Sequence, residues 1–231
     1  MIQTLSTSPY FGAALTLSVF CLAYILNKRW PGPLSTPLLV GTAVVATVLL
    51  LCGIPYSAYN NGAKYLTYFL MPVTVCFAVP MYRQLPLLKK HAPAILLAIF
   101  IGCVSSVMAV CILCVFFGLG DIVAKSLGAI STTTAIAIGI TEKLGGAVSL
   151  TVSAVIITGV LGASVSDRVC RAMGLTNPVA RGLSIGNASH AAGTVKAMEM
   201  GPVEGAASSL AIVLSGLMTA VLAPLIIRMF F

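Results

Sequence analysis

Long apolar runs joined by short basic segments are the feature that most constrains how this chain can fold. Residues 36–52 and 93–117, for example, are dense in Val, Leu, Ile and Ala and contain no charged side chain. Only 8% of the 231 residues are charged, whereas a soluble domain carries about 25%. Because so apolar a chain cannot cover its surface with polar groups in water, the sequence predicts an all-α polytopic membrane protein of about seven or eight membrane segments.

The basic residues gather in the short gaps between the apolar runs, at 28–29, 83–90 and 168–181. Lys and Arg in short loops mark the cytoplasmic side of a membrane protein. The net charge of +8 therefore has a topological explanation, and no nucleic acid is expected as a partner. The first apolar run, 11–26, has no basic segment before it and is followed at once by Lys28, which predicts an uncleaved first span.

Six runs are typical of plain membrane spans, namely 11–26, 36–52, 66–81, 93–117, 145–164 and 206–227. The Pro-Gly-Pro sequence at 31–33 predicts a rigid loop after the first span, and Pro72 and Pro80 predict a kink in the third. Residues 53–65 combine turn formers with three tyrosines, which is typical of a loop at the outer membrane interface. Residues 167–181 are predicted as a basic loop on the inner side.

Two further segments, 121–143 and 182–200, are apolar enough to enter a membrane but are interrupted by glycines and polar residues. The basic loop lies on the inner side only if 121–143 enters and leaves on the outer side, after which 182–200 enters from the inner side. Such paired broken helices are typical of transporters built from inverted repeats. In the alternative, which stays open here, 121–143 crosses fully and the later topology is reversed.

The two interrupted segments are the predicted functional places, because polar groups at membrane depth are costly. A broken helix offers free backbone N–H groups and the positive end of its dipole, which attract carboxylates and other anions. The alternative is that these small polar residues only let helices pack closely, as the GxxxG pair of Gly182 and Gly186 would. The candidate substrate-binding residues are Ser131, Thr132, Thr133, Thr134, Asn187, Ser189, His190, Gly193 and Thr194.

Among these candidates, His190 is the one that titrates near neutral pH. It is interpreted either as a substrate ligand or proton-coupling group, or as the donor of one structural hydrogen bond between helices. Lys196 and Glu199 are three residues apart and share a helix face, so they are expected to pair with each other.

Neither an enzyme nor a metal protein is expected. Ser189 and His190 are adjacent, so on a helix they point about 100° apart and cannot form a nucleophile–base pair. Cys111 and Cys114 have CxxC spacing but lie in an apolar run without a second ligand pair nearby. No cofactor is predicted.

The interrupted segments also resemble a known family. Residues 181–196 read RGLSIGNASHAAGTVK, residues 204–211 read EGAASSLA, and residues 131–137 read STTTAIA with Leu144-Gly-Gly after them. On these stretches the chain is similar to the LrgB/CidB family over nearly its whole length, as one integral membrane domain at 1–231. It departs from the family's Pro-Lys-Ser-Val-Thr-Thr-Pro pattern at 129–135, where the basic residue and both prolines are missing.

The resemblance implies a multi-pass protein of the bacterial cytoplasmic membrane. Members of the family are described as holin- or antiholin-like regulators of murein hydrolase export and autolysis, usually with a small LrgA/CidA-type membrane partner. Relatives in plastids exchange glycolate and glycerate, and bacterial members are linked to pyruvate. The broken segments favour transport of a small monocarboxylate such as pyruvate, lactate or glycolate, in a homodimer. A regulator of lysis without transport activity is the competing interpretation.

Overall fold

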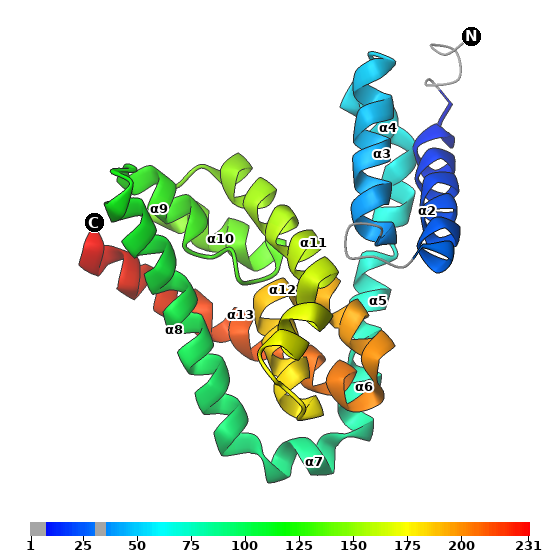
Figure 1. The fold of residues 1–231 in the computed structure, drawn as a ribbon. Coiled ribbons are helices and arrows are strands. Elements are labelled where there is room, and N and C mark those ends of the chain that lie inside the picture. The colour runs from blue at the N-terminus through cyan, green and yellow to red at the C-terminus, as the bar shows by residue number, and fades with distance from the viewer. Residues whose placement is uncertain (1–7, 31–35) are drawn as a thin grey trace. The chain divides into compact units, whose positions relative to one another are not determined.

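The computed structural model of the chain describes residues 8–30 and 36–231 (Figure 1). The predicted loop at 31–33 lies outside these residues. Throughout the described residues the regular structure is helical, without strands, which confirms the all-α prediction. The chain divides into two compact units, 1–76 and 77–231. That the whole chain is one membrane domain stays a prediction.

The first unit contains α2 (Phe11–Arg29), α3 (Pro37–Leu51), α4 (Tyr56–Thr67) and α5 (Leu70–Cys76). Helix α2 packs against both α3 and α4. It approaches α4 closely where Gly12 faces Gly62, because a methyl group at Gly12 would lie 2.6 Å from the backbone nitrogen of Ala63. Beside this contact, the Thr16 and Tyr59 hydroxyls are hydrogen bonded at 2.7 Å.

Two predictions about this region are wrong. Residues 53–65 are not a loop, since α4 begins directly after Pro55. Proline is compatible with the start of a helix, and α4 itself contains no proline. The run 66–81 is not one kinked span either, because it is divided among the end of α4, α5 and α6. Its two prolines interrupt the helical hydrogen bonding too often for one continuous helix.

The second unit contains eight helices in the described chain: α6 (Ala78–Arg83), α7 (Leu85–Lys90), α8 (Ala92–Phe116), α9 (Asp121–Leu127), α10 (Thr134–Leu144), α11 (Val148–Ala172), α12 (Pro178–Met200) and α13 (Pro202–Phe230). Helices α8, α11 and α13, together with α2, are long and apolar enough to cross a membrane. The predicted loop at 167–181 is shorter than expected, because α11 extends to Ala172 and α12 begins at Pro178. Lengthening both helices satisfies backbone groups that a loop would leave free.

Helices α9 and α10 form a hairpin around a non-helical break at 128–133. Residues on either side of the break lie together, since Ala147, which follows α10, donates its backbone N–H to the hydroxyl of Ser126, near the end of α9, at 2.7 Å. Next to this bond, the Thr151 hydroxyl of α11 donates to the Ser126 carbonyl at 2.7 Å and is hydrogen bonded to Thr141 at 2.9 Å. The segment therefore folds back on itself at the break.

Helix α12 is a second hairpin, which turns at His190. A methyl group at Gly193 would lie 2.8 Å from the Ile185 carbonyl oxygen, although eight residues of straight helix would separate the two by about 12 Å. The two ends of α12 also contact the same short stretch of α13. Gly182 packs on Ala207, and Met198 packs on Gly205.

The two hairpins approach α13 from its opposite ends. The α12 hairpin packs along the N-terminal half of α13, from Glu204 to Ser208, whereas Gly128 of the first hairpin packs on Ile227. Helix α13 has 29 residues and is therefore about 43 Å long, enough to cross the apolar core of a bilayer. If α13 spans the membrane, each hairpin enters and leaves on one side, and the two sides differ. The prediction of two broken segments is thus confirmed.

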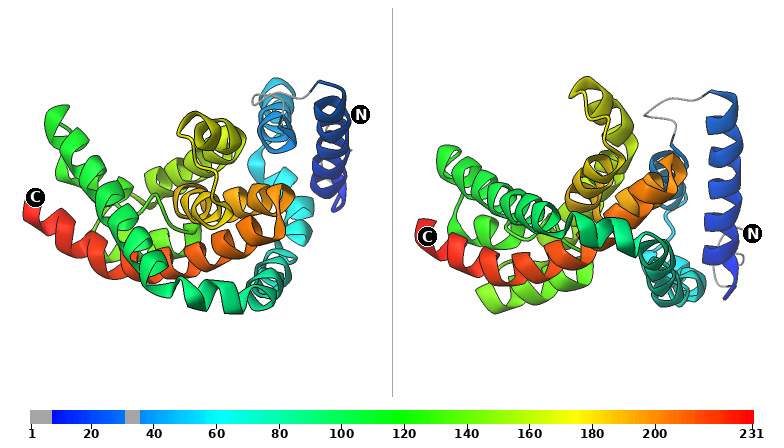
Figure 2. Two further views of the ribbon diagram at one scale, coloured as in Figure 1. Left: turned by 60° about the horizontal axis from the view of Figure 1, so that its bottom comes forward. Right: turned by 90° about the horizontal axis from the view of Figure 1, so that it is seen from below.

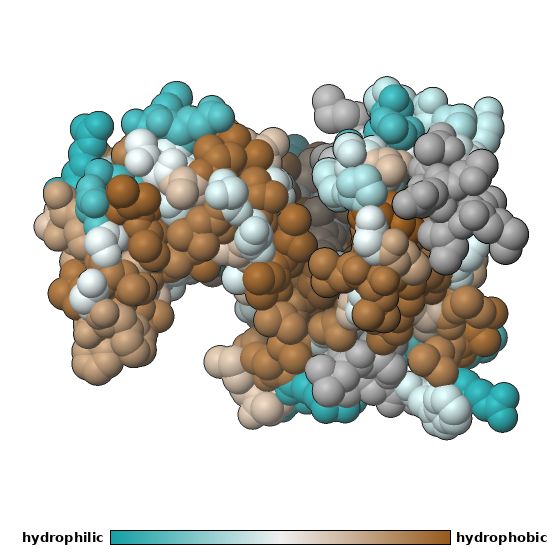
Figure 3. All heavy atoms as spheres, turned by 90° about the horizontal axis from the view of Figure 1, so that it is seen from above, coloured by the Kyte–Doolittle hydropathy of each residue, from teal (hydrophilic) through white to brown (hydrophobic). Residues whose placement is uncertain are grey.

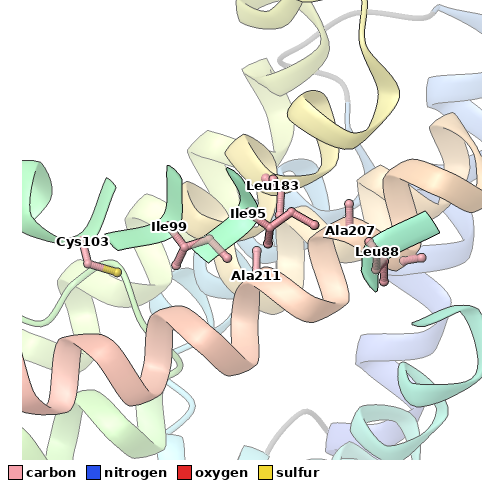
Figure 4. Packing of buried hydrophobic residues seen from close by; sticks show 8 residues of the cluster. Leu88, Ile95, Ile99, Cys103, Leu183, Ala207 and Ala211 are labelled. Atoms are coloured by element: carbon pink, nitrogen blue, oxygen red, sulfur yellow. The ribbon is translucent and has the colours of Figure 1, made fainter. Parts of the chain in front are cut away.

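Helix α8 crosses α13 and closes the core of this unit (Figures 1 and 2). In Figure 4, Ile95 and Ile99 of α8 lie beside Leu183 of α12 and Ala211 of α13. The small residues of α12 and α13 allow this close packing. Leu97, Ile112 and Leu217 point outward and are more than half exposed. The face drawn in Figure 3 is mostly apolar, with hydrophilic residues in groups near its edges, as expected for a surface that faces lipid.

Candidate functional site

The turn of the second hairpin is built on an unusual backbone conformation at His190. Its φ of 42° and ψ of −129° lie in a region that residues with a Cβ rarely adopt, at a cost of roughly 1–3 kcal/mol. Two consecutive hydrogen bonds connect this turn to α13. The Thr194 hydroxyl donates to the His190 carbonyl at 3.0 Å and is hydrogen bonded to Ser208 of α13 at 2.7 Å.

The two breaks meet at this turn. His190 Nε2 lies 3.0 Å from the carbonyl oxygen of Ile130, in the break between α9 and α10. Because a carbonyl can only accept, Nε2 carries the proton in this contact. The ring is 6% exposed and packs against Gly159 of α11, where a methyl group would lie 3.0 Å from its Cε1 atom. This contact joins 121–143 to 182–200 through a backbone group.

A cavity of about 630 Å³ opens beside the meeting point of the two hairpins. It lies among α8, the break at 128–133, α11 and the first half of α12. Among the described residues that line it, none is charged. Its polar lining consists of hydroxyls and one amide, from Ser105, Ser106, Ser131, Thr158, Ser184 and Asn187.

Ser131 is the most informative of these lining residues. Its side chain is 6% exposed, and its hydroxyl has no hydrogen-bond partner in the described part of the chain. A buried hydroxyl without a partner costs about 1–3 kcal/mol, and the residue that carries this one lines the cavity. Asn187 also lines the cavity, packs on Gly102 and accepts a weak hydrogen bond from Cys103 Sγ at 3.6 Å.

The other predicted site residues lie around the breaks without lining the cavity. The Thr132 hydroxyl donates to the Ala129 carbonyl at 3.2 Å, Thr133 precedes the first turn of α10, and Thr134 opens that helix. The remaining predicted residues, Ser189, Gly193 and Thr194, are buried within the second hairpin. Their burial supports a role in shaping the turn.

A charge cluster lies where the second hairpin begins. Arg181 donates to Asp167 of α11 at 3.0 Å and lies 3.9 Å from Glu204 of α13. Arg171 also pairs with Asp167. One guanidinium group therefore connects three helices. The predicted pair of Lys196 and Glu199 is confirmed, at 2.8 Å.

The chain matches the family model described as the LrgB-like family over residues 16–229. It belongs to the LrgB-like family. "Antiholin-like protein LrgB" of Bacillus mycoides (strain KBAB4) and of Bacillus cereus (strain B4264) are each 35% identical to it, over 94% of this chain and 95% of theirs. "Uncharacterized protein YwbG" of Bacillus subtilis (strain 168) is 37% identical over 92% of this chain and 95% of its own. No solved structure matches.

The predicted resemblance is thereby confirmed. With its apolar helices, this LrgB-like protein is a multi-pass protein of the bacterial membrane.

Sequence reasoning about this LrgB-like protein missed part of the cavity wall. Ser105 and Ser106 lie in α8, a run that reads as a plain span, and Thr158 lies in α11. The adjacent serines in an otherwise apolar span could have indicated a polar cavity, since each hydroxyl at membrane depth needs a partner. The packing interpretation is correct for Gly182 and Gly186, which both contact α13.

Proposed function

We propose that this chain is an antiholin-like membrane protein that restrains autolysis. The observation that carries this proposal is the comparison with relatives of that name, which are 35% identical over 94% of the chain. In this role it acts with a small membrane partner of the LrgA/CidA type, and as a homodimer.

The test of this role is autolysis in cells that lack their own LrgB-like protein. Expression of this chain, with and without the small partner, is expected to slow the fall in turbidity after detergent treatment. Lysis at the rate of cells with an empty vector, under both conditions, would contradict the antiholin-like role.

A second candidate function, transport of small monocarboxylates such as pyruvate, lactate or glycolate, is favoured by the geometry of the two hairpins. Their breaks meet beside an uncharged, hydroxyl-lined cavity, and Ser131, one of its lining residues, has a buried hydroxyl without a partner in the described part of the chain. The break also leaves backbone N–H groups free at the start of the 11-residue helix α10, a few residues after Ser131, and such groups favour a carboxylate. Discontinuous helices that meet near the middle of a membrane bind substrates in this way in known transporters.

In this second function Ser131 and Asn187 bind the carboxylate from two walls of the cavity. His190 holds the two breaks together, because its Nε2 proton is committed to the Ile130 carbonyl. Proton coupling through His190 remains a prediction that needs this bond to break during the cycle.

The transport test is uptake of labelled pyruvate, lactate and glycolate into proteoliposomes. A lost hydrogen bond of about 1.5 kcal/mol weakens binding roughly tenfold, so Ser131→Ala is expected to lower uptake at limiting substrate about tenfold. Ser153→Ala is the matched control, since Ser153 is exposed on α11 and does not line the cavity. Absence of saturable uptake by the wild type, with and without the small partner, would exclude transport and leave the antiholin-like role standing.

A further inference from the structure

A second, smaller pocket lies at the end of the second unit that holds the C-terminal end of α13. Three basic residues from three helices line it: Lys125 of α9, Lys143 of α10 and Arg228 of α13. Its remaining lining is apolar, from Leu144, Ile227 and Phe231, and its volume is about 260 Å³. The pocket is separate from the hydroxyl-lined cavity, with which it shares no lining residue.

The apolar base of the pocket is tightly packed. Ile227 is 1% exposed and is wedged against Gly128, so the first hairpin and α13 are packed together beneath the basic side chains. Lys125 is held in place by Asp121, at 2.6 Å, and is 28% exposed. The fold therefore brings the cations together from positions far apart in the sequence.

The positive charge of this pocket is only partly compensated. Asp121 pairs with Lys125, but Lys143 and Arg228 have no ion-pair partner in the described part of the chain. No acidic side chain is among the described lining residues. Cations that converge with fewer counter-charges than cations favour an anion with several acceptor oxygens.

The position of the pocket points to a phosphate group. Arg228 lies in the last turn of α13, a helix able to span a membrane, so the pocket is expected at the depth of lipid headgroups. Exposed apolar side chains lie one helical turn before two of the cations, Leu225 at 58% before Arg228 and Ile122 at 55% before Lys125, and they suit contact with acyl chains. Basic pockets between membrane helices bind anionic headgroups by this combination.

We propose that Lys125, Lys143 and Arg228 form a binding site for a phosphate-bearing anion, whose source is the headgroup of an anionic phospholipid. Because α9, α10 and α13 all contribute a cation, the bound group would join the first hairpin to α13.

The test measures binding to the full chain in a nonionic detergent by native mass spectrometry. The lipids are phosphatidylglycerol and, as the zwitterionic comparison, phosphatidylethanolamine with the same acyl chains. Each cation contributes about 1 kcal/mol, so Lys143→Ala with Arg228→Ala is expected to weaken phosphatidylglycerol binding about 30-fold. The matched control is Arg83→Ala with Lys89→Ala, which removes one Arg and one Lys from exposed positions outside the pocket.

A thermal-shift measurement with inorganic phosphate alone distinguishes the two possible sources of the bound group, a phospholipid headgroup and free phosphate. Protection of the wild type but not of the pocket variant would assign the site to a free phosphate, and no protection together with phosphatidylglycerol binding assigns it to lipid. If the double variant does not fold, Lys143→Gln, at an exposed position, is expected to weaken binding about fivefold. Equal binding of both ligands by the pocket variants and the control would overturn the proposal.

Discussion

At the scale of single residues, His190 combines a strained backbone with a side chain that connects the two breaks. Its backbone conformation suits glycine, whereas its Nε2 bond to Ile130 needs the imidazole. We predict that His190→Gly is more stable than His190→Ala by about 1–2 kcal/mol, because both lose the ring but only glycine relieves the strain. For a chain of this size the thermal midpoint should differ by a few degrees. Equal midpoints of the two purified variants in detergent would show that the turn is not strained.

The same residues mark how far sequence reasoning reaches. His190 can be singled out because it is a titratable group in a weakly polar segment. Its partner cannot, since Ile130 contributes a backbone carbonyl 60 residues away and carries no sequence signal. Ser131 was predicted as one of four neighbouring hydroxyls. Which of the four faces the cavity depends on the backbone of the break, and the sequence pattern does not contain it.

At the scale of helices, close approach between α12 and α13 depends on glycine. A methyl group at Gly186 would lie 2.8 Å from Ser208 Cα, whereas one at Gly139 of α10 meets no atom within 4 Å. We predict that Gly186→Ala destabilises the protein by about 1–3 kcal/mol through overpacking. The matched change Gly139→Ala is expected to stabilise it by roughly 0.5–1 kcal/mol, because glycine disfavours helix interiors. Thermal unfolding measures the effect of both substitutions. A shift of both thermal midpoints in the same direction would contradict the close packing of Gly186 on α13.

Helix positions were predictable where a run was long and apolar, as for α8, because such a run has no stable alternative in a membrane. The sequence was misleading at α4, where tyrosines and asparagines resemble a loop but pack as a helix against α2. The folding back of α12 was a prediction from charge alone. It becomes visible only through contacts between residues far apart along the helix, such as Gly193 and Ile185.

At the scale of the whole second unit, the two hairpins give the protein a testable topology. The exposed ends of the first hairpin, Asp121 and Lys143, should face one side of the membrane, and Thr176 and Glu199 at the ends of the second should face the other. We predict this for single cysteines placed at the four positions in a cysteine-free variant, probed in oriented vesicles with a maleimide that does not cross membranes.

Each pair of cysteines provides its own control, because a hairpin brings its two ends to the same side whereas a crossing segment separates them. Labelling of positions 121 and 143 from opposite sides would mean that the segment crosses, and the contact between Ser126 and Ala147 would then be incompatible with the membrane-embedded protein. Labelling of all four positions from one side would contradict the packing of the hairpins on opposite ends of α13. Opposite-sided entry brings the Ile130 carbonyl and His190 together between the two surfaces, where a carrier needs its binding site.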